Sequence, residues 1–205
     1  MSKRHCCIRI LVVVVAILTS GAVPAGAAPQ QSDQSVADLT AKCDQKDAVA
    51  CTYVAALYES GSFVKKDLGR AAALYGQACD LGNAPGCLVL AELFQDGKGV
   101  PKDASKATAL YQKACDGGTG EGCSRLGVIY LKGLGGVSKD QSKAVALFQQ
   151  ACDKGDSPMG CHNLGYCIEN GIGVPKDKKK GVEFFVKGCR LARSTGLDVE
   201  QACKP

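Results

Sequence analysis

The sequence predicts an all-α fold, a right-handed α/α solenoid in which helix pairs stack one after another. Three observations support this fold class. A unit typified by residues 103–130 recurs with periods of 36, 36 and 38 residues. Apolar side chains inside each unit follow helical spacing, and two cysteines eight or nine residues apart mark each junction between units. Because one helix pair cannot bury its apolar face alone, a repeat of this length indicates stacked neighbours.

Residues 1–28 are expected to be a secretory signal peptide, cleaved after residue 27 or 28. Lys3 and Arg4 open the chain, residues 10–18 form an unbroken apolar run, and small residues precede the expected cleavage site. The alternative is a membrane anchor, but a spanning helix needs about 20 apolar residues. We therefore expect no stable membrane anchor and a periplasmic or secreted mature protein.

Composition narrows the class of protein further. The chain is 46% hydrophobic and only 5% aromatic, so its core is built mainly from small and aliphatic residues. The chain has thirteen cysteines, two of them in the expected signal peptide. This number indicates either an oxidising compartment or metal binding. After residue 28 the chain has one histidine, His162, and no Cys-x-x-Cys, which disfavours zinc. We expect no metal and no cofactor. In the mature chain, basic and acidic side chains are nearly balanced, 22 against 20, which indicates no nucleic-acid partner.

The mature chain is predicted to have four parts. Residues 29–35 are a flexible leader, because they are mostly Pro, Gln, Ser and Asp, and the first helix is expected to begin near Ser35. Residues 36–47 resemble the second helix of a truncated repeat. Full repeats begin at four opening cysteines, and residues 197–205 form a C-terminal cap. The opening cysteines are Cys51, Cys87, Cys123 and Cys161.

The first helix of each repeat carries an apolar stripe with a small residue in its middle. Counting from the opening cysteine, position three is Val54, Leu90, Leu126 and Leu164, and position four is Ala55, Ala91, Gly127 and Gly165. The small residue is expected to let the partner helix approach closely. A glycine follows the helix and is expected to end it in a left-handed conformation. These glycines are Gly61, Gly97, Gly133 and Gly171.

The second helix of each repeat begins after a Lys-Asp pair, and the aspartate is expected to cap the helix. These residues are Asp67, Asp103, Asp140 and Asp177. An apolar stripe follows, which includes Tyr75, Tyr111, Phe148 and Phe185. The helix is expected to end at Ala-Cys in three repeats and at Gly188-Cys189 in the fourth. The charged run from Lys176 to Lys180 is interpreted as a solvated first turn rather than a binding patch.

The pattern Leu-Gly, Gly-x-Gly-Val-x-Lys-Asp, Lys-Ala-x-x-Leu-Tyr or Phe, then Ala-Cys-Asp resembles the SEL-like repeat family, whose units are tetratricopeptide-like helix pairs. The paired cysteines are similar to those of the branch typified by the Helicobacter cysteine-rich proteins. The resemblance covers residues 36–203. Three departures stand out: Ser62-Phe63 replaces Gly-x-Gly, one residue is inserted in 133–137, and Arg190 replaces the usual Asp.

The resemblance implies that each cysteine pair is a disulfide between the second helix of one repeat and the first helix of the next. Local pairing is also the easiest arrangement physically, because each pair brackets one turn. The expected pairs are Cys43–Cys51, Cys79–Cys87, Cys115–Cys123, Cys152–Cys161 and, over a longer loop, Cys189–Cys203. The odd cysteine, Cys167, occupies an apolar-stripe position and is expected to be a buried, inert thiol.

Catalytic patterns are scarce in this sequence. Some members of the resembled family are described as weak penicillin-binding or β-lactamase proteins, so a hydrolase of this type is the alternative function. Residues 62–65 match Ser-x-x-Lys formally, but no Ser-Asp-Asn or Lys-Thr-Gly accompanies them. His162 lacks the second cysteine of a haem-attachment motif, so a haem or metal carrier ranks third. We assign no catalytic residue.

The remaining function is recognition of another protein or an extended peptide segment, since a solenoid of helix pairs forms a concave groove. By analogy with related helical repeats, positions one and five after each opening cysteine are expected to line this groove, and position two is expected to lie at its edge. We expect the protein to be a monomer. The strongest candidates differ from unit to unit, unlike the core positions. They are Tyr53, Leu88, Glu92, Arg125, Val128, His162, Asn163 and Tyr166.

Overall fold

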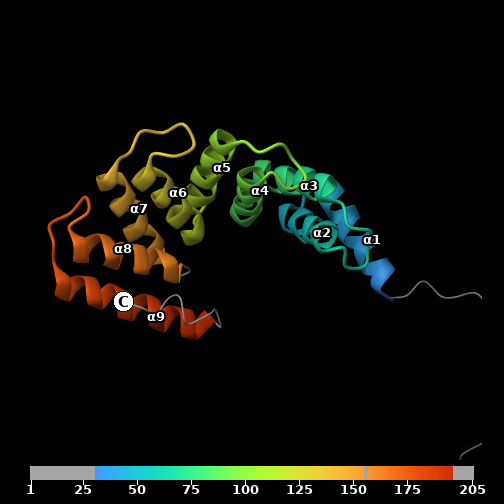
Figure 1. Cartoon of the computed structure of the whole chain (residues 1–205). Helices are drawn as coiled ribbons and strands as arrows, with labels where there is room; N and C mark the ends of the chain where they lie inside the picture. The colour runs from blue at the N-terminus through green and yellow to red at the C-terminus, as the bar shows by residue number, and fades with distance from the viewer. Residues whose placement is uncertain (1–30, 155–156, 196–205) are drawn as a thin grey trace, which may run out of the picture.

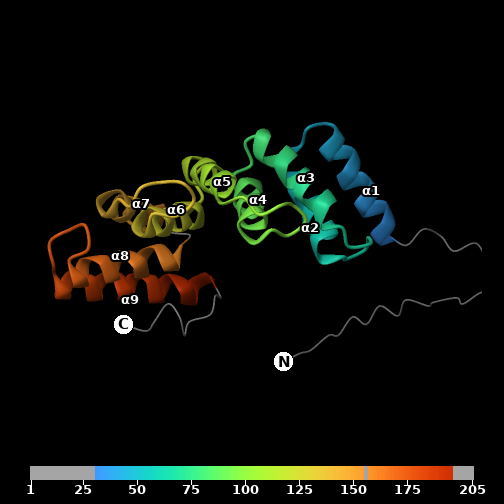
Figure 2. The same ribbon diagram turned by 45° about the horizontal axis from the view of Figure 1, so that its top comes forward.

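A computed structural model describes residues 31–154 and 157–195. These residues fold into nine helices and no strand, which confirms the all-α prediction. The helices are α1 (Gln31–Asp44), α2 (Ala48–Ser60), α3 (Leu68–Asp80), α4 (Ala84–Asp96), α5 (Ala104–Asp116), α6 (Gly120–Lys132), α7 (Gln141–Lys154), α8 (Pro158–Asn170) and α9 (Lys178–Thr195). They stack in chain order into an arch (Figure 1), and α8 and α9 lie side by side at its C-terminal end (Figure 2).

The first helix of each repeat begins three residues before its opening cysteine, earlier than the cysteine register alone indicates. Capping residues explain the difference. Asp47 accepts hydrogen bonds from the backbone N–H of Val49 and Ala50, and Asn83 accepts one from Gly86. Ser157 caps α8 in the same way. A Ser, Thr, Asn or Asp immediately before a helical pattern is a recognisable start signal, and one stands four residues before each opening cysteine, although Thr119 at the start of α6 makes no side-chain cap hydrogen bond.

The second helices begin as predicted. Each N-cap aspartate accepts a hydrogen bond from the backbone N–H three residues later, at 2.9 Å for Asp67 and Asp103, 2.8 Å for Asp140 and 3.0 Å for Asp177. The glycines that end the first helices are also confirmed as left-handed, with φ between 69° and 79°. There the chain turns so tightly that the Cβ of a lysine in the next segment lies over the glycine. These caps orient both helices of every repeat.

The core is continuous between repeats. One cluster joins Ala91 of α4, Tyr111 of α5, Leu126 of α6 and Leu147 of α7, all of them buried. The small residue at position four permits this packing, because a Cβ added to Gly127 would lie 2.5 Å from the Phe148 ring. Each helix pair is therefore stabilised by its neighbours along the stack.

Four disulfides join successive repeats as predicted. Their Cα–Cα distances are 4.6 Å for Cys43–Cys51 and Cys79–Cys87, and 4.5 Å for Cys115–Cys123 and Cys152–Cys161. Cys189 is also disulfide-bonded, and its expected partner Cys203 lies outside the described residues. Cys167 is a free thiol in the core, and burial raises its pKa to about 11. Its thiolate is disfavoured there, as expected of an inert cysteine.

Two boundaries differ from the sequence-based expectation. Helix α1 begins at Gln31, not near Ser35, because the polar residues placed in the leader form its first turn. Helix α9 continues past Cys189 to Thr195. Other repeats have a glycine three residues after this cysteine, such as Gly82 and Gly118, whereas α9 has Ala192, a strong helix former. The expected cap at 197–205 lies outside the described residues.

Candidate functional site

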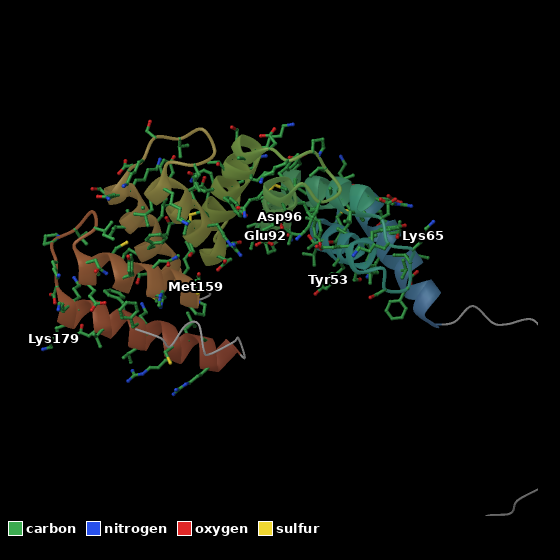
Figure 3. The ribbon with its side chains drawn as sticks, in the orientation of Figure 1. Tyr53, Lys65, Glu92, Asp96, Met159 and Lys179 are labelled. Atoms are coloured by element: carbon green, nitrogen blue, oxygen red, sulfur yellow. A yellow bond between two sulfur atoms is a disulfide. The ribbon has the colours of Figure 1, made fainter. Side chains whose placement is uncertain are left out.

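The candidate groove residues lie on the first helices of the repeats, α2, α4, α6 and α8. None of the eight is buried: Tyr53, Arg125 and Tyr166 are exposed, and the other five are half-buried. Figure 3 shows Tyr53 and Glu92 on the inner side of the arch. The surface formed by these eight residues is called the concave face below. Their neighbours in the same helices that belong to the core, such as Val54 and Leu126, are fully buried. Each helix therefore has one face packed in the core and another face exposed to solvent.

Arg125 is the centre of a charged network on the concave face. Its guanidinium pairs with Glu121 one turn earlier on α6, at 2.9 Å, and with Glu92 of the preceding repeat, at 3.2 Å. Burial, together with Glu121, Asp96 and Glu59, raises the pKa of Glu92, while Arg125 opposes that rise. An arginine among the groove candidates could contact a ligand through its charge, but in the structure the charge of Arg125 is paired with two carboxylates of the protein.

Two hollows flank Arg125. The first, of about 230 Å³, lies between α2, α4 and α6 and is lined by Glu59, Glu92, Asp96 and Lys98 as well as Arg125. The second, of about 450 Å³, is more apolar and includes Val128, Ile129 and Leu134 beside Arg125. Sequence reasoning missed Glu59 and Asp96, which occupy the last turns of α2 and α4. Their position near the C-terminal end of a groove-lining helix was the available signal.

Tyr53 and Tyr166 lie on the first and the last of the groove-lining helices. Their exposed fractions are 61% and 50%, which is high for tyrosine side chains on ordered helices. Asn163 on α8 donates to the Ser124 hydroxyl on α6 at 3.4 Å and so connects two repeats. Its amide is partly engaged within the protein, whereas the tyrosine rings offer free contact area.

His162, Leu88 and Val128 belong partly to the core. The His162 ring lies 4.9 Å from the ring of Phe185 on α9, and its buried Nδ1 has no hydrogen-bond partner among the described residues. Burial lowers the pKa of His162, so the ring is neutral near pH 7. Leu88 and Val128 pack against core clusters. These three side chains form the floor of the concave face rather than freely presented contacts.

The formal Ser-x-x-Lys match does not form a pair of interacting side chains. The Ser62 hydroxyl accepts a hydrogen bond from Ser60 at 3.0 Å, and Lys65 is exposed. Across residues 31–154 and 157–195, no group of three His, Cys, Asp or Glu side chains is arranged to hold a metal ion. Over the same part of the chain, no helix has the length and apolar character needed to cross a membrane.

The fold and this surface define a class of protein: a helical-repeat scaffold whose units are joined by disulfides. The sequence matches the Sel1 repeat family over residues 48–83, 84–119, 120–156 and 158–192, and the protein belongs to this family. Each of the four matched units begins with the first helix of a repeat, three residues before its opening cysteine. A comparison with curated proteins finds no match.

Solved structures extend the comparison. The chain is 38% identical to Helicobacter pylori cysteine rich protein B, over 70% of this chain and 97% of that one, with a TM-score of 0.51. A protective antigen of uropathogenic Escherichia coli, which displays an SLR fold, is 28% identical with a TM-score of 0.71; the alignment covers 81% of this chain and 38% of the antigen. A Sel1 repeat protein of Oxalobacter formigenes shares the fold at 24% identity and a TM-score of 0.71, over 84% and 76% of the two chains.

Proposed function

We propose that this protein is an exported interaction scaffold that binds an extended segment of another protein along its concave face. Sel1 repeats are generally protein-interaction modules, and the structural disulfides indicate an oxidising, extracytoplasmic environment. The observation that carries the proposal is that core positions and accessible positions of the groove-lining helices vary differently between repeats. Core positions are alike in every repeat, while the accessible positions differ and include two exposed tyrosines.

The chemistry of the concave face suggests how a segment binds. Tyr53 and Tyr166 provide large amphipathic rings at the two ends, and few rotamers are lost when they are immobilised. Between them, the hollows beside Arg125 offer a polar and a more apolar recess. Arg125 acts in this proposal by holding Glu92 and Glu121 in place, because its charge is already paired. The two tyrosines are then the residues whose loss weakens binding most.

The test is a selection of peptides from a random display library on the immobilised, oxidised protein, followed by affinity measurement by calorimetry. Tyr53→Ala and Tyr166→Ala should each weaken the selected peptides by more than about 1 kcal/mol, as expected for exposed aromatic anchors. The matched control is Phe63→Ala, an equally exposed aromatic outside the concave face. Unchanged affinity in both tyrosine variants, with intact helical circular dichroism, would place recognition elsewhere.

A further inference from the structure

A second surface with a strong charge lies along the segments that connect the two helices of each repeat. Residues 61–70, 97–106, 132–143 and 172–180 form what we call the basic edge. These segments contain thirteen basic residues and four aspartates, a net charge of +9, whereas the whole chain carries +5. The basic residues are Lys65, Lys66, Arg70, Lys98, Lys102, Lys106, Lys132, Lys139, Lys143, Lys176, Lys178, Lys179 and Lys180.

The positive charge of the basic edge is largely uncompensated. All thirteen side chains are exposed, and the four aspartates each accept a backbone hydrogen bond at a helix N-terminus. In the described part of the chain, only two of these cations form ion pairs: Lys98 with Asp96 at 2.7 Å and Lys106 with Asp103 at 3.6 Å. The remaining cations face solvent along the whole stack, from Lys65 at one outer end of the arch to Lys179 at the other (Figure 3).

Hollows accompany the charge in the first and third repeats. One of about 460 Å³ is lined by Tyr58, Lys65, Lys66 and Arg70 together with the N-cap Asp67. The other, an open hollow of about 700 Å³, has the corresponding residues Tyr130, Lys139, Lys143 and the N-cap Asp140, together with uncharged polar side chains. In both, a cation covers the tyrosine ring, at 4.4 Å for Arg70 over Tyr58 and 4.0 Å for Lys143 over Tyr130. The edge therefore has concave places where an anionic group can approach several cations.

We propose that the basic edge binds a linear acidic polysaccharide, and this proposal includes the run from Lys176 to Lys180, which by itself was interpreted above as a solvated turn. Twelve of the thirteen cations are lysines, which act as hydrated point charges and lack the planar fork that recognises one phosphate or carboxylate specifically. This composition suits carboxylates spaced along a flexible chain. Stacking of nucleic-acid bases is disfavoured because the two tyrosine faces are already covered by cations. A flat membrane reaches only part of an edge that follows an arch, while a linear polymer can follow it from repeat to repeat.

The proposal is tested with fluorescein-labelled alginate, a linear polyuronate, and the full-length mature protein. Four lysines hold the same register in the four repeats, just before the N-cap aspartate, and the test variant is Lys66→Gln/Lys102→Gln/Lys139→Gln/Lys176→Gln. A matched control removes four exposed cations elsewhere: Lys42→Gln/Lys46→Gln/Arg190→Gln/Arg193→Gln. Both variants have the same net charge. We expect wild type to bind alginate at roughly 50 mM salt with salt-dependent affinity, the test variant to bind about tenfold more weakly, and the control to bind like wild type.

Four results would overturn the proposal. In the first, wild type fails to bind alginate at low salt. In the second, the control variant loses as much affinity as the test variant. In the third and fourth, phosphatidylglycerol vesicles or single-stranded DNA bind more tightly than alginate. Vesicle binding would implicate the exposed Phe63 and Leu134 at two of the connecting segments. None of the four substituted lysines belongs to the concave face or lines the two hollows beside Arg125, so each outcome leaves the proposed peptide binding unaffected.

Discussion

At the residue scale, two helical glycines have opposite effects on stability. Gly127 is enclosed by the Phe148 ring, at 2.5 Å from an added Cβ, whereas the nearest atom to an added Cβ at Gly76 is 3.8 Å away in Leu90. We predict that Gly127→Ala destabilises the protein by about 1–3 kcal/mol through overpacking, and that Gly76→Ala stabilises it by about 0.5–1 kcal/mol through helix propensity. Urea unfolding of both variants checks the prediction. Equal effects would contradict the close packing of α6 on α7.

The buried Nδ1 of His162 has no hydrogen-bond partner in the part of the chain that the structure describes, and this predicts a specific pH dependence. Burial lowers the pKa of this ring below its ordinary value of 6.5, so the unfolded chain binds its proton more readily than the folded one. Stability from the neutral ring is therefore present above pH 6.5 and is lost as the pH falls towards the folded pKa. Relative to His162→Gln, wild type should lose stability between about pH 7 and pH 5.

The measurement is urea unfolding at both pH values. Asn163→Ala, a neighbouring change that adds or removes no titrating group, is the control and should keep a constant difference from wild type. A His162→Gln variant that follows wild type at both pH values would show that the ring is protonated equally in the folded and unfolded chains.

At the scale of elements, the disulfides restrain the turns between repeats. Cys115–Cys123 closes a short loop between α5 and α6, in the middle of the stack. Chain entropy gives such a loop about 2–3 kcal/mol of stabilisation. We predict that Cys115→Ala/Cys123→Ala lowers the free energy of unfolding by this amount, with helical circular dichroism retained at low temperature.

Cys43→Ala/Cys51→Ala is the matched comparison, because it removes a pair of the same spacing at the N-terminal end. Among the described residues, α1 is bordered by a repeat on one side only, so fewer contacts depend on the turn. A larger loss at Cys43–Cys51 than at Cys115–Cys123 would contradict the view that stability spreads from neighbour to neighbour along the stack.

At the scale of the whole molecule, α9, the last helix that the structure describes, has an exposed apolar stripe. Val182 on α9 corresponds to Ala72, Thr108 and Val145, which the next repeat covers to 8% exposure or less, yet Val182 is 50% exposed among the described residues. Val186, one turn later, is 44% exposed. We propose that residues 197–205, tied back by Cys189–Cys203, cover this stripe.

Removal of the segment should therefore expose a self-complementary apolar face. We predict that a chain ending at Thr195, with Cys189→Ser, self-associates in analytical ultracentrifugation, while the full mature chain stays monomeric. Adding Val182→Lys/Val186→Lys to the truncated chain should restore the monomer. A truncated chain that remains monomeric without these lysines would contradict the capping role.

The solenoid, the register of its repeats, the caps of the second helices and the four described disulfides could all be predicted from the sequence alone. These features depend on residues close together in the chain: Asp67 caps a helix three residues away, and Cys79 pairs across one turn. The regular spacing of these residues is therefore enough to predict the caps and the disulfides. Even the extension of α9 was visible in the missing glycine after Cys189.

The contacts of the candidate site residues could not be predicted from the sequence, because they depend on tertiary packing. Arg125 meets Glu92 across two repeats, and His162 packs on Phe185 of the next helix. Neither contact follows from a periodic pattern, because it depends on how far each helix is rotated against its neighbour. The Lys-Asp pairs of the basic edge are visible in the sequence, but the stacking of the helices decides where their segments lie, as Figure 3 shows for Lys65 and Lys179 at the two ends of the arch. Long-range packing thus places the residues of the concave face and of the basic edge on two chemically distinct surfaces.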